Sequence, residues 1–321
     1  MELLRNPADH GYPVEYLLSR IKGRRSRLIR DWRPLLFDPG QFESQPSLKT
    51  GGFQKDRSSD AVWRNLMGEY QWVHGQMNQE LRDIFSPYFL YTELRTIFIC
   101  FRRLGDKKAG VVEELLDKSL LSDEIKKILM LSADLQSAVS GIERRFSDFS
   151  PRFQGLGKAL ESGGLRSVEQ RLLETYFAVT IGSRLHRLMR AFFVRLIDGR
   201  NILSLYKYLR LEFKTRPFFI PGGGISEMTL RDAMQKGELL AVVPLVRECT
   251  GITVERPDAT SIEVALYRGM TRWLRKEGRD PFGVAPILDY LWQCSIEAMN
   301  LSVLYHTRDL EREAVAAELV Q

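Results

Sequence analysis

The chain has 321 residues, of which 44% are hydrophobic, and its formal net charge is +6. The hydrophobic content is sufficient for one large folded domain or for two or three of ordinary size, and it excludes a disordered chain. The charge is compatible with a nucleic-acid partner, with an anionic membrane surface or with solubility alone, so it excludes none of these classes.

Neither a secretion signal nor a membrane-spanning segment is expected. The N-terminus has no apolar stretch followed by a small-residue cleavage site. The most apolar windows, "YFLYTELRTIFICF" and "AFFVRLIDGRNILSLY", are interrupted by charges well before the roughly 20 apolar residues that a spanning helix needs. The three cysteines lie far apart among apolar residues, which predicts reduced, buried thiols in a cytosolic protein and no metal cluster.

Helical spacing dominates the chain from its first segment. From Val14 to Leu28, apolar residues recur at three- and four-residue steps between arginines, which predicts an amphipathic helix with a basic outer surface. The segment Phe42–Asp60 is rich in Gly, Ser and Lys and predicts a loop. We expect further helices at about residues 61–84, 87–104, 111–116, 123–131 and 134–145. The stretch "LLAVVPLV" from Leu239 is ambiguous, but no alternating strand pattern or hairpin signal occurs, so the predicted fold class is all-α.

Three segments of the chain resemble one another. Each segment contains an acid and, three residues later, a polar residue. Apolar residues then follow at the fourth, seventh and eighth positions after the acid. These pairs are Glu93 and Thr96, Asp198 and Asn201, and Glu297 and Asn300. The acids are 105 and 99 residues apart (198 − 93 and 297 − 198), and each segment is followed by a short amphipathic helix. We therefore predict three related helical bundles, at residues 1–132, 133–236 and 237–321.

The repeated pairs have an architectural interpretation. Residues three apart on a helix share a face, so an acid and an amide there can bond jointly to a neighbouring helix end or loop. We interpret the pairs as devices that orient helices rather than as catalytic groups.

The sequence contains no catalytic constellation. "IPGGGISEM" suggests a phosphate-binding loop, but it lacks the Lys-Ser/Thr that would follow, and no clear strand precedes it. We predict instead a turn before a helix that starts near Glu227 and is capped by Ser226. The four histidines are dispersed and none has ligand spacing. No nucleophile has an evident base, so we expect no catalytic residue, no metal and no cofactor.

Arginines are concentrated in a second segment, "RLHRLMRAFFVRL", which we predict as a helix with apolar residues on one side and arginines on the other. These arginines are Arg184, Arg187, Arg190 and Arg195. A basic helix face can bind nucleic acid, but no known nucleic-acid-binding module surrounds this one. The segment is therefore interpreted as a solvated or partner-facing surface.

Three stretches resemble the C subunit of the archaeal and bacterial V-type (A-type) ATPases, the equivalent of the d subunit of the eukaryotic vacuolar enzyme. They are the opening helix "YLLSRIKGRRSRLI", the pair "LIDGRNILSLYKYLR" and "FIPGGGIS", and the terminal "PILDYLWQCSIEAMNLSVLYHTRDLEREAVAAEL". The resemblance covers essentially the whole chain, and its order and spacing are more specific than any single motif. Three features depart from the family pattern. They are Thr96, where Asn is expected, Ser302, where the family often has Arg, and the linker Phe42–Asp60, which is unlike that of a typical member.

The resemblance implies a funnel of three pseudo-symmetric helical domains that sits on the cytoplasmic end of the membrane rotor ring and receives the central stalk. Its members are peripheral, non-catalytic and present as monomers within the complex, and their partners are the central-stalk subunits and the ring proteolipids. On this reading the candidate partner-binding residues, which would face an acidic stalk subunit or anionic lipid, are Arg20, Arg24, Arg27, Arg184 and Arg187. The turn at Pro221–Gly224 is a candidate for contact with the ring.

Two alternatives remain at this point. A basic helical-repeat scaffold or RNA-binding protein is consistent with the net charge and the arginine-rich helices, and it predicts nucleic-acid binding that weakens steeply with salt. A small-molecule enzyme built in a helical bundle has only Asp198 and Glu297 as candidate acids.

Overall fold

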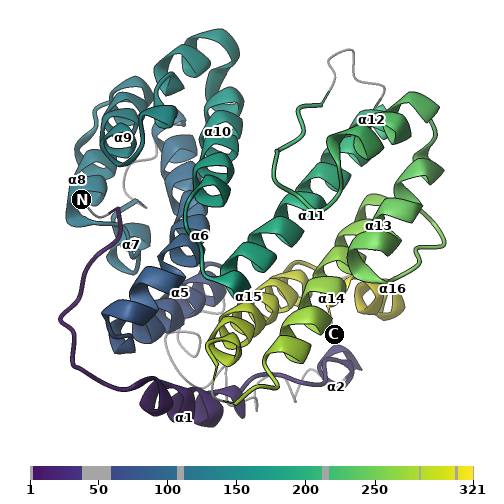
Figure 1. Ribbon diagram of the computed structural model, residues 1–321, viewed down its shortest axis with the longest axis horizontal. Coiled ribbons are helices and arrows are strands. Elements are labelled where there is room, and N and C mark those ends of the chain that lie inside the picture. The colour runs from purple at the N-terminus through teal and green to yellow at the C-terminus, as the bar shows by residue number, and fades with distance from the viewer. Residues whose placement is uncertain are drawn as a thin grey trace. The chain divides into compact units, whose positions relative to one another are not determined.

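The computed structural model describes residues 3–37, 59–106, 112–211, 217–281, 283–307 and 310–320. These residues are mostly helical (Figure 1), and the only β-pairing among them is an isolated bridge between Leu4 and Leu121. The all-α prediction is confirmed. The loop predicted at Phe42–Asp60 lies outside the described residues, apart from Ser59 and Asp60 at the start of a helix.

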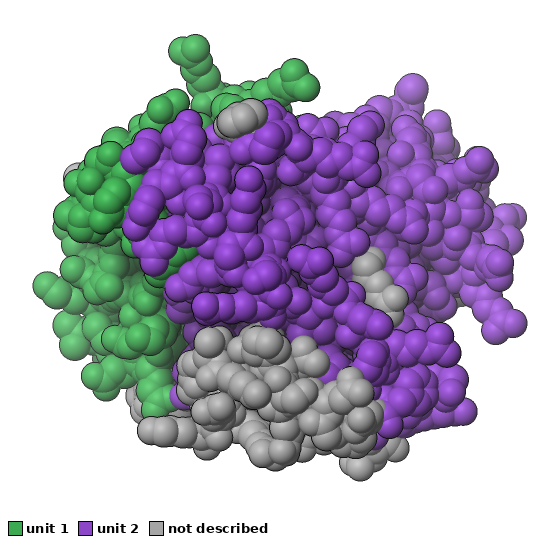
Figure 2. Space-filling view, turned by 90° about the horizontal axis from the view of Figure 1, so that it is seen from below, with its two compact units in different colours: residues 1–12, 70–193 green, residues 13–69, 194–321 purple. Residues whose placement is uncertain are grey.

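The chain divides into two compact units, which Figure 2 shows in different colours. Unit 1 comprises residues 1–12 and 70–193, and unit 2 comprises residues 13–69 and 194–321. Both later boundaries fall inside helices, α5 (Ser59–Gln76) and α11 (Arg187–Leu211). The division into three bundles remains a prediction.

Unit 1 is built around a long helix, α6, and its aromatic residues. Its complete helices are α6 (Gln79–Gly105), α7 (Val112–Asp117), α8 (Asp123–Leu131), α9 (Leu135–Phe149), η3 (Pro151–Phe153) and α10 (Leu156–Gly182). α6 packs against α9 and α10. Phe89, Phe177 and Phe193 are fully buried, and the rings of Phe177 and Phe193 meet edge-on with centroids 6.2 Å apart. α10 bends at Gly164, whose φ of 67° lies in the left-handed region that favours glycine.

Unit 2 combines the N-terminal helices with the C-terminal half of the chain. Its complete helices are α1 (Val14–Arg25), α2 (Arg33–Phe37), α12 (Glu227–Lys236), η4 (Leu239–Ala241), α13 (Val242–Thr250), α14 (Ala259–Glu277), α15 (Ala285–His306) and α16 (Arg312–Glu318). α1 packs against α15, and α2 packs against α16. A cluster of buried apolar residues joins α11 to α12, α13 and α14 through side chains such as Leu205, Leu230, Val246 and Ile262. The chain thus places its N-terminal helices against its last ones.

Several helix predictions are confirmed, and the ambiguous stretch is resolved. α8 spans the predicted residues Asp123–Leu131. α12 begins at Glu227, and the Ser226 side chain accepts a hydrogen bond from the Thr229 N–H at 3.1 Å, which makes Ser226 its N-cap. The stretch from Leu239 forms η4 and α13 rather than a strand.

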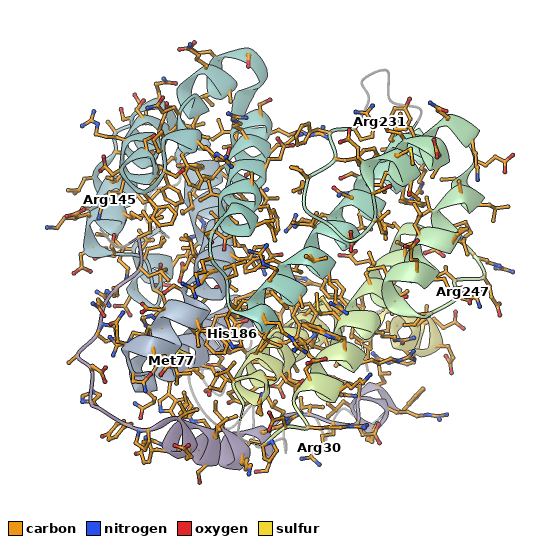
Figure 3. The ribbon with its side chains drawn as sticks, in the orientation of Figure 1. Arg30, Met77, Arg145, His186, Arg231 and Arg247 are labelled. Carbon is orange, nitrogen blue, oxygen red and sulfur yellow. The ribbon has the colours of Figure 1, made fainter. Side chains whose placement is uncertain are left out.

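The predicted break between helices at residues 84–87 is wrong. α5 ends at Gln76, and α6 runs from Gln79 through Pro87 to Gly105. Asn78 caps α6, because its side chain accepts from the Leu81 N–H at 3.0 Å, and Met77 lies at the junction (Figure 3). Pro87 removes one helical hydrogen bond, a loss that the fully buried Phe85 and Phe89 on the same helix outweigh.

The predicted basic helix starts later than expected. Arg184 lies in the connection between α10 and α11, and Arg187 is the first residue of α11. His186 ends this connection, since its Nδ1 accepts from the Leu188 N–H at 3.3 Å. Arg190 donates to the carbonyls of Ile181 and Ser183 at the end of α10, so it serves the connection instead of a basic surface.

Candidate functional site

The second acid and amide pair fixes one loop of unit 2. On α11, the Asp198 carboxylate accepts from the N–H groups of Gly224 and Ile225, each at 3.0 Å. One turn later, the Asn201 amide donates to the Ile220 carbonyl at 2.9 Å and accepts from the Ile220 N–H at 2.8 Å. The pair therefore binds both ends of the Gly-rich turn.

This geometry explains the glycine run. A Cβ at Gly223 would lie 2.3 Å from the Asp198 Oδ1, and one at Gly224 would lie 3.1 Å from its Oδ2. Only glycine lets the backbone approach the carboxylate so closely. The backbone N–H groups of Gly224 and Ile225 donate to the carboxylate of Asp198 in the same chain, within the turn that the sequence predicted before α12.

The third pair makes the same amide contact. Asn300 on α15 donates to the Val320 carbonyl at 2.8 Å and accepts from the Val320 N–H at 3.0 Å. The partners of Asn201 and Asn300 lie 19 and 20 residues further along the chain. Glu297 instead accepts from the N–H of Ile29, in the segment after α1, at 2.8 Å. The N-terminal segment of unit 2 is thus tied to the third repeat motif.

The first pair differs in its second member. Glu93 on α6 accepts from the Leu120 N–H at 2.5 Å and from the Ser119 hydroxyl at 2.8 Å. Leu120 follows Glu93 by 27 residues, and Ile225 follows Asp198 by the same number, so the two acids hold equivalent positions. Thr96 is too short for the two-bond amide contact and hydrogen-bonds to Glu93 instead.

The buried carboxylates of the first two pairs accept hydrogen bonds from backbone N–H groups. Burial raises the pKa of Glu93, against the hydrogen bonds from Leu120 and Ser119. Burial also raises the pKa of Asp198, against the N–H groups of Ile225 and Gly224. Within the described ranges, no three His, Cys, Asp or Glu side chains are grouped so that they would hold a metal ion.

A further polar network, which the sequence did not reveal, ties α1 to the rest of unit 2. Arg25 forms an ion pair with Asp289 on α15, whose side chain is 0% exposed. Glu69 on α5 accepts from Arg24 and from the Tyr290 hydroxyl, both at 2.6 Å. The acid Asp289 within the apolar run "PILDYL" was the available signal, but nothing in the sequence separates Arg25 from its basic neighbours.

The predicted partner-binding arginines therefore have different environments. Arg20 is exposed on α1 and contacts the Tyr16 ring and hydroxyl. Arg24 is partly buried and engaged with Glu69. Arg27 is exposed in the turn after α1, not on the predicted longer helix, and Arg184 and Arg187 are both exposed around the start of α11.

Replacing Asn201 or Asn300 by Ala is expected to lower the free energy of unfolding by about 2–4 kcal/mol, because each change leaves a buried N–H and a buried carbonyl unpaired. Urea titration of each variant measures the loss. Thr96→Val is the control, since it removes a hydrogen bond at the matching repeat position without freeing a backbone pair, and about 1 kcal/mol is expected. Equal losses in all three variants would contradict the role assigned to the amides.

His74 is expected to make unit 1 sensitive to acid. Burial, helped by the charge of Arg82, lowers the pKa of His74 to about 4. Because the unfolded chain takes up this proton near the ordinary pKa and the folded chain does not, the free energy of unfolding falls as the pH drops. Between about pH 7 and about pH 5 the loss is expected to be about 2 kcal/mol. Denaturant titrations at both pH values should show a smaller loss for His74→Gln, and an unchanged loss would exclude His74 as its source.

Comparison with known proteins is consistent with this all-helical architecture. No helix of the described ranges has the length and apolar content needed to span a bilayer. No curated protein sequence matches the chain significantly. A family model described as ATP synthase (C/AC39) subunit matches residues 49–311, which is most of the chain. The chain therefore belongs to the ATP synthase (C/AC39) subunit family and is a subunit of a V/A-type rotary ATPase.

Proposed function

We propose that this chain is a non-catalytic central-stalk subunit that couples the central stalk to the membrane rotor ring, for ion transport or ATP synthesis. The family match over residues 49–311 is the observation that carries the proposal. In this role the protein is peripheral, lies at the cytoplasmic face of the membrane and contacts stalk subunits and ring proteolipids. Three related bundles arranged as a funnel would suit a many-fold ring, because only some of their loops need to engage at once.

Transmission of torque requires a body that resists deformation. The acid and amide pairs support this requirement, since Asp198, Asn201 and Asn300 each fix a loop or a chain segment to a long helix. Protein interiors packed to crystal-like density transmit strain rather than absorb it. The backbone contacts of Asp198, Asn201 and Asn300 therefore favour a stiff unit 2, as a mechanical function requires.

The two alternatives have less support. An enzyme would need Asp198 or Glu297 as its acid, but both Asp198 oxygens accept backbone N–H groups and Glu297 accepts the N–H of Ile29. A basic scaffold or RNA-binding protein would need an outward-facing basic helix, but Arg24 and Arg25 of α1 pair with acids of unit 2. The family match favours neither alternative.

Four exposed arginines are candidates for contact with partners, namely Arg20, Arg27, Arg184 and Arg187. Arg184 and Arg187 lie at the N-terminal end of α11, where the helix dipole adds to their positive potential and attracts an acidic surface. Arg24 contributes less, since Glu69 already compensates its charge.

A pull-down of the tagged chain from detergent-solubilised membranes of its own organism tests the proposed function. Co-purification of head, stalk and ring subunits in fixed proportion, identified by mass, is the expected result. The isolated chain should hydrolyse no ATP. Recovery of nucleic acid or of unrelated proteins in their place would overturn the proposal.

A further inference from the structure

A small pocket opens on unit 2 beside the third acid and amide pair. The segment after α1, the helices α14 and α15, and Val320 all contribute to it. Its charged and polar side chains are Arg30, Thr271, Arg275, Gln293 and Glu297, and Trp32 and Ile296 are among its apolar residues. The enclosed space admits only a few atoms, so the pocket suits the end of a side chain better than a nucleotide or another cofactor.

The two arginines of the pocket are available to a partner. Arg30 and Arg275 are exposed, and the structure gives neither guanidinium a hydrogen bond or ion pair with any described residue. The charge of Arg275 also acts on the buried carboxylate of Asp289, which already pairs with Arg25. By contrast, Glu297 is committed to the Ile29 N–H. The charged lining thus comprises two guanidinium groups and one carboxylate, and a single negative charge balances it.

We propose that this pocket binds a carboxylate side chain presented by an acidic segment of a partner protein. Guanidinium groups recognise a carboxylate through paired, charge-assisted hydrogen bonds. Trp32 and Ile296 supply apolar surface for the methylene groups of an Asp or Glu side chain. A doubly charged phosphate carries more negative charge than the net positive charge of the lining, and a lipid headgroup is larger than the space in the pocket. That the partner is another component of the rotary ATPase rests on the proposed function, whereas the chemistry of the pocket does not.

The test uses the full chain and a defined probe, a fluorescein-labelled peptide of five Glu-Ala repeats, with fluorescence anisotropy as the readout. The pocket variant is Arg30→Ala with Arg275→Ala. The matched control is Arg33→Ala with Arg272→Ala, which removes the same charge from exposed positions of α2 and α14 outside the pocket. Circular dichroism confirms that both variants fold.

The pocket variant is expected to bind the peptide about tenfold or more weakly, and the control about threefold or less weakly. Equal losses in both variants, or no loss in either, would overturn the proposal. Vesicles of phosphatidylcholine with phosphatidylserine, tested by co-sedimentation, should bind all three proteins alike. A loss of vesicle binding confined to the pocket variant would assign the site to lipid instead.

The pull-down then separates this proposal from the proposed function. Suppose that the wild-type chain recovers the ATPase subunits and the pocket variant binds the peptide normally. The proposed function would then be supported, and the proposed carboxylate site would be excluded. Suppose instead that the wild-type chain recovers no such subunits and the pocket variant loses peptide binding. The carboxylate site would then be supported, and the proposed function would be excluded.

Discussion

Replacing Gly223 by Ala is expected to lower the free energy of unfolding by about 3 kcal/mol or more. The added Cβ would lie 2.3 Å from the Asp198 Oδ1 and 3.2 Å from the Ile197 Cγ2, so the loop or the carboxylate has to move. Either movement breaks the hydrogen bonds that Asp198 accepts from Gly224 and Ile225. Urea or thermal unfolding of the variant measures the loss.

Two comparisons separate this clash from the general cost of losing a glycine. Gly23→Ala, in α1, has nothing within 4 Å of its new Cβ and should stabilise the chain by about 0.5–1 kcal/mol through helix propensity. In an Asp198→Ala background the clash with the carboxylate is absent, so the further loss caused by Gly223→Ala should shrink by about 1–3 kcal/mol. Additive losses would show that the cost of Gly223→Ala does not come from a clash with the Asp198 carboxylate.

Local sequence signals predicted much of the fold. Helical periodicity gave the fold class and the bounds of α8, and the Ser226 cap gave the start of α12. These predictions succeeded because each depends on residues within one or two turns of each other. The break at Pro87 failed because the cap at Asn78 and the buried aromatic residues of α6 outweigh one missing hydrogen bond.

The candidate site was only partly accessible to sequence reasoning. The internal repeat singled out Asp198 and Asn201, whose partners lie 19 to 27 residues away. It did not identify the partner of Glu297, because Ile29 is 268 residues distant and belongs to no repeat motif. Contacts between the two ends of a chain depend on tertiary packing, which the periodicity of a single helix does not encode.

Arg25→Met is expected to lower the free energy of unfolding by about 3 kcal/mol, because it leaves the carboxylate of Asp289 buried without its cation. The full cost of breaking a buried pair is moderated here, since the Arg25 side chain is 35% exposed. Arg24→Met is the matched control on the same helix. Its partner Glu69 is 21% exposed and keeps the Tyr290 hydroxyl as a donor, so a loss of about 1 kcal/mol is expected.

The stability loss in Arg25→Met is expected to change with pH in a direction that a simple loss of packing would not produce. Burial raises the pKa of Asp289 while the charge of Arg25 lowers it, so removal of Arg25 raises the pKa further. A carboxyl whose folded pKa exceeds its unfolded pKa adds stability as it takes up a proton, so the loss in Arg25→Met should shrink as the pH falls. Adding Asp289→Asn should likewise restore most of the stability at neutral pH. If the loss is the same at every pH, Arg25 stabilises α1 only through its aliphatic stem, and the charge of Asp289 is compensated elsewhere.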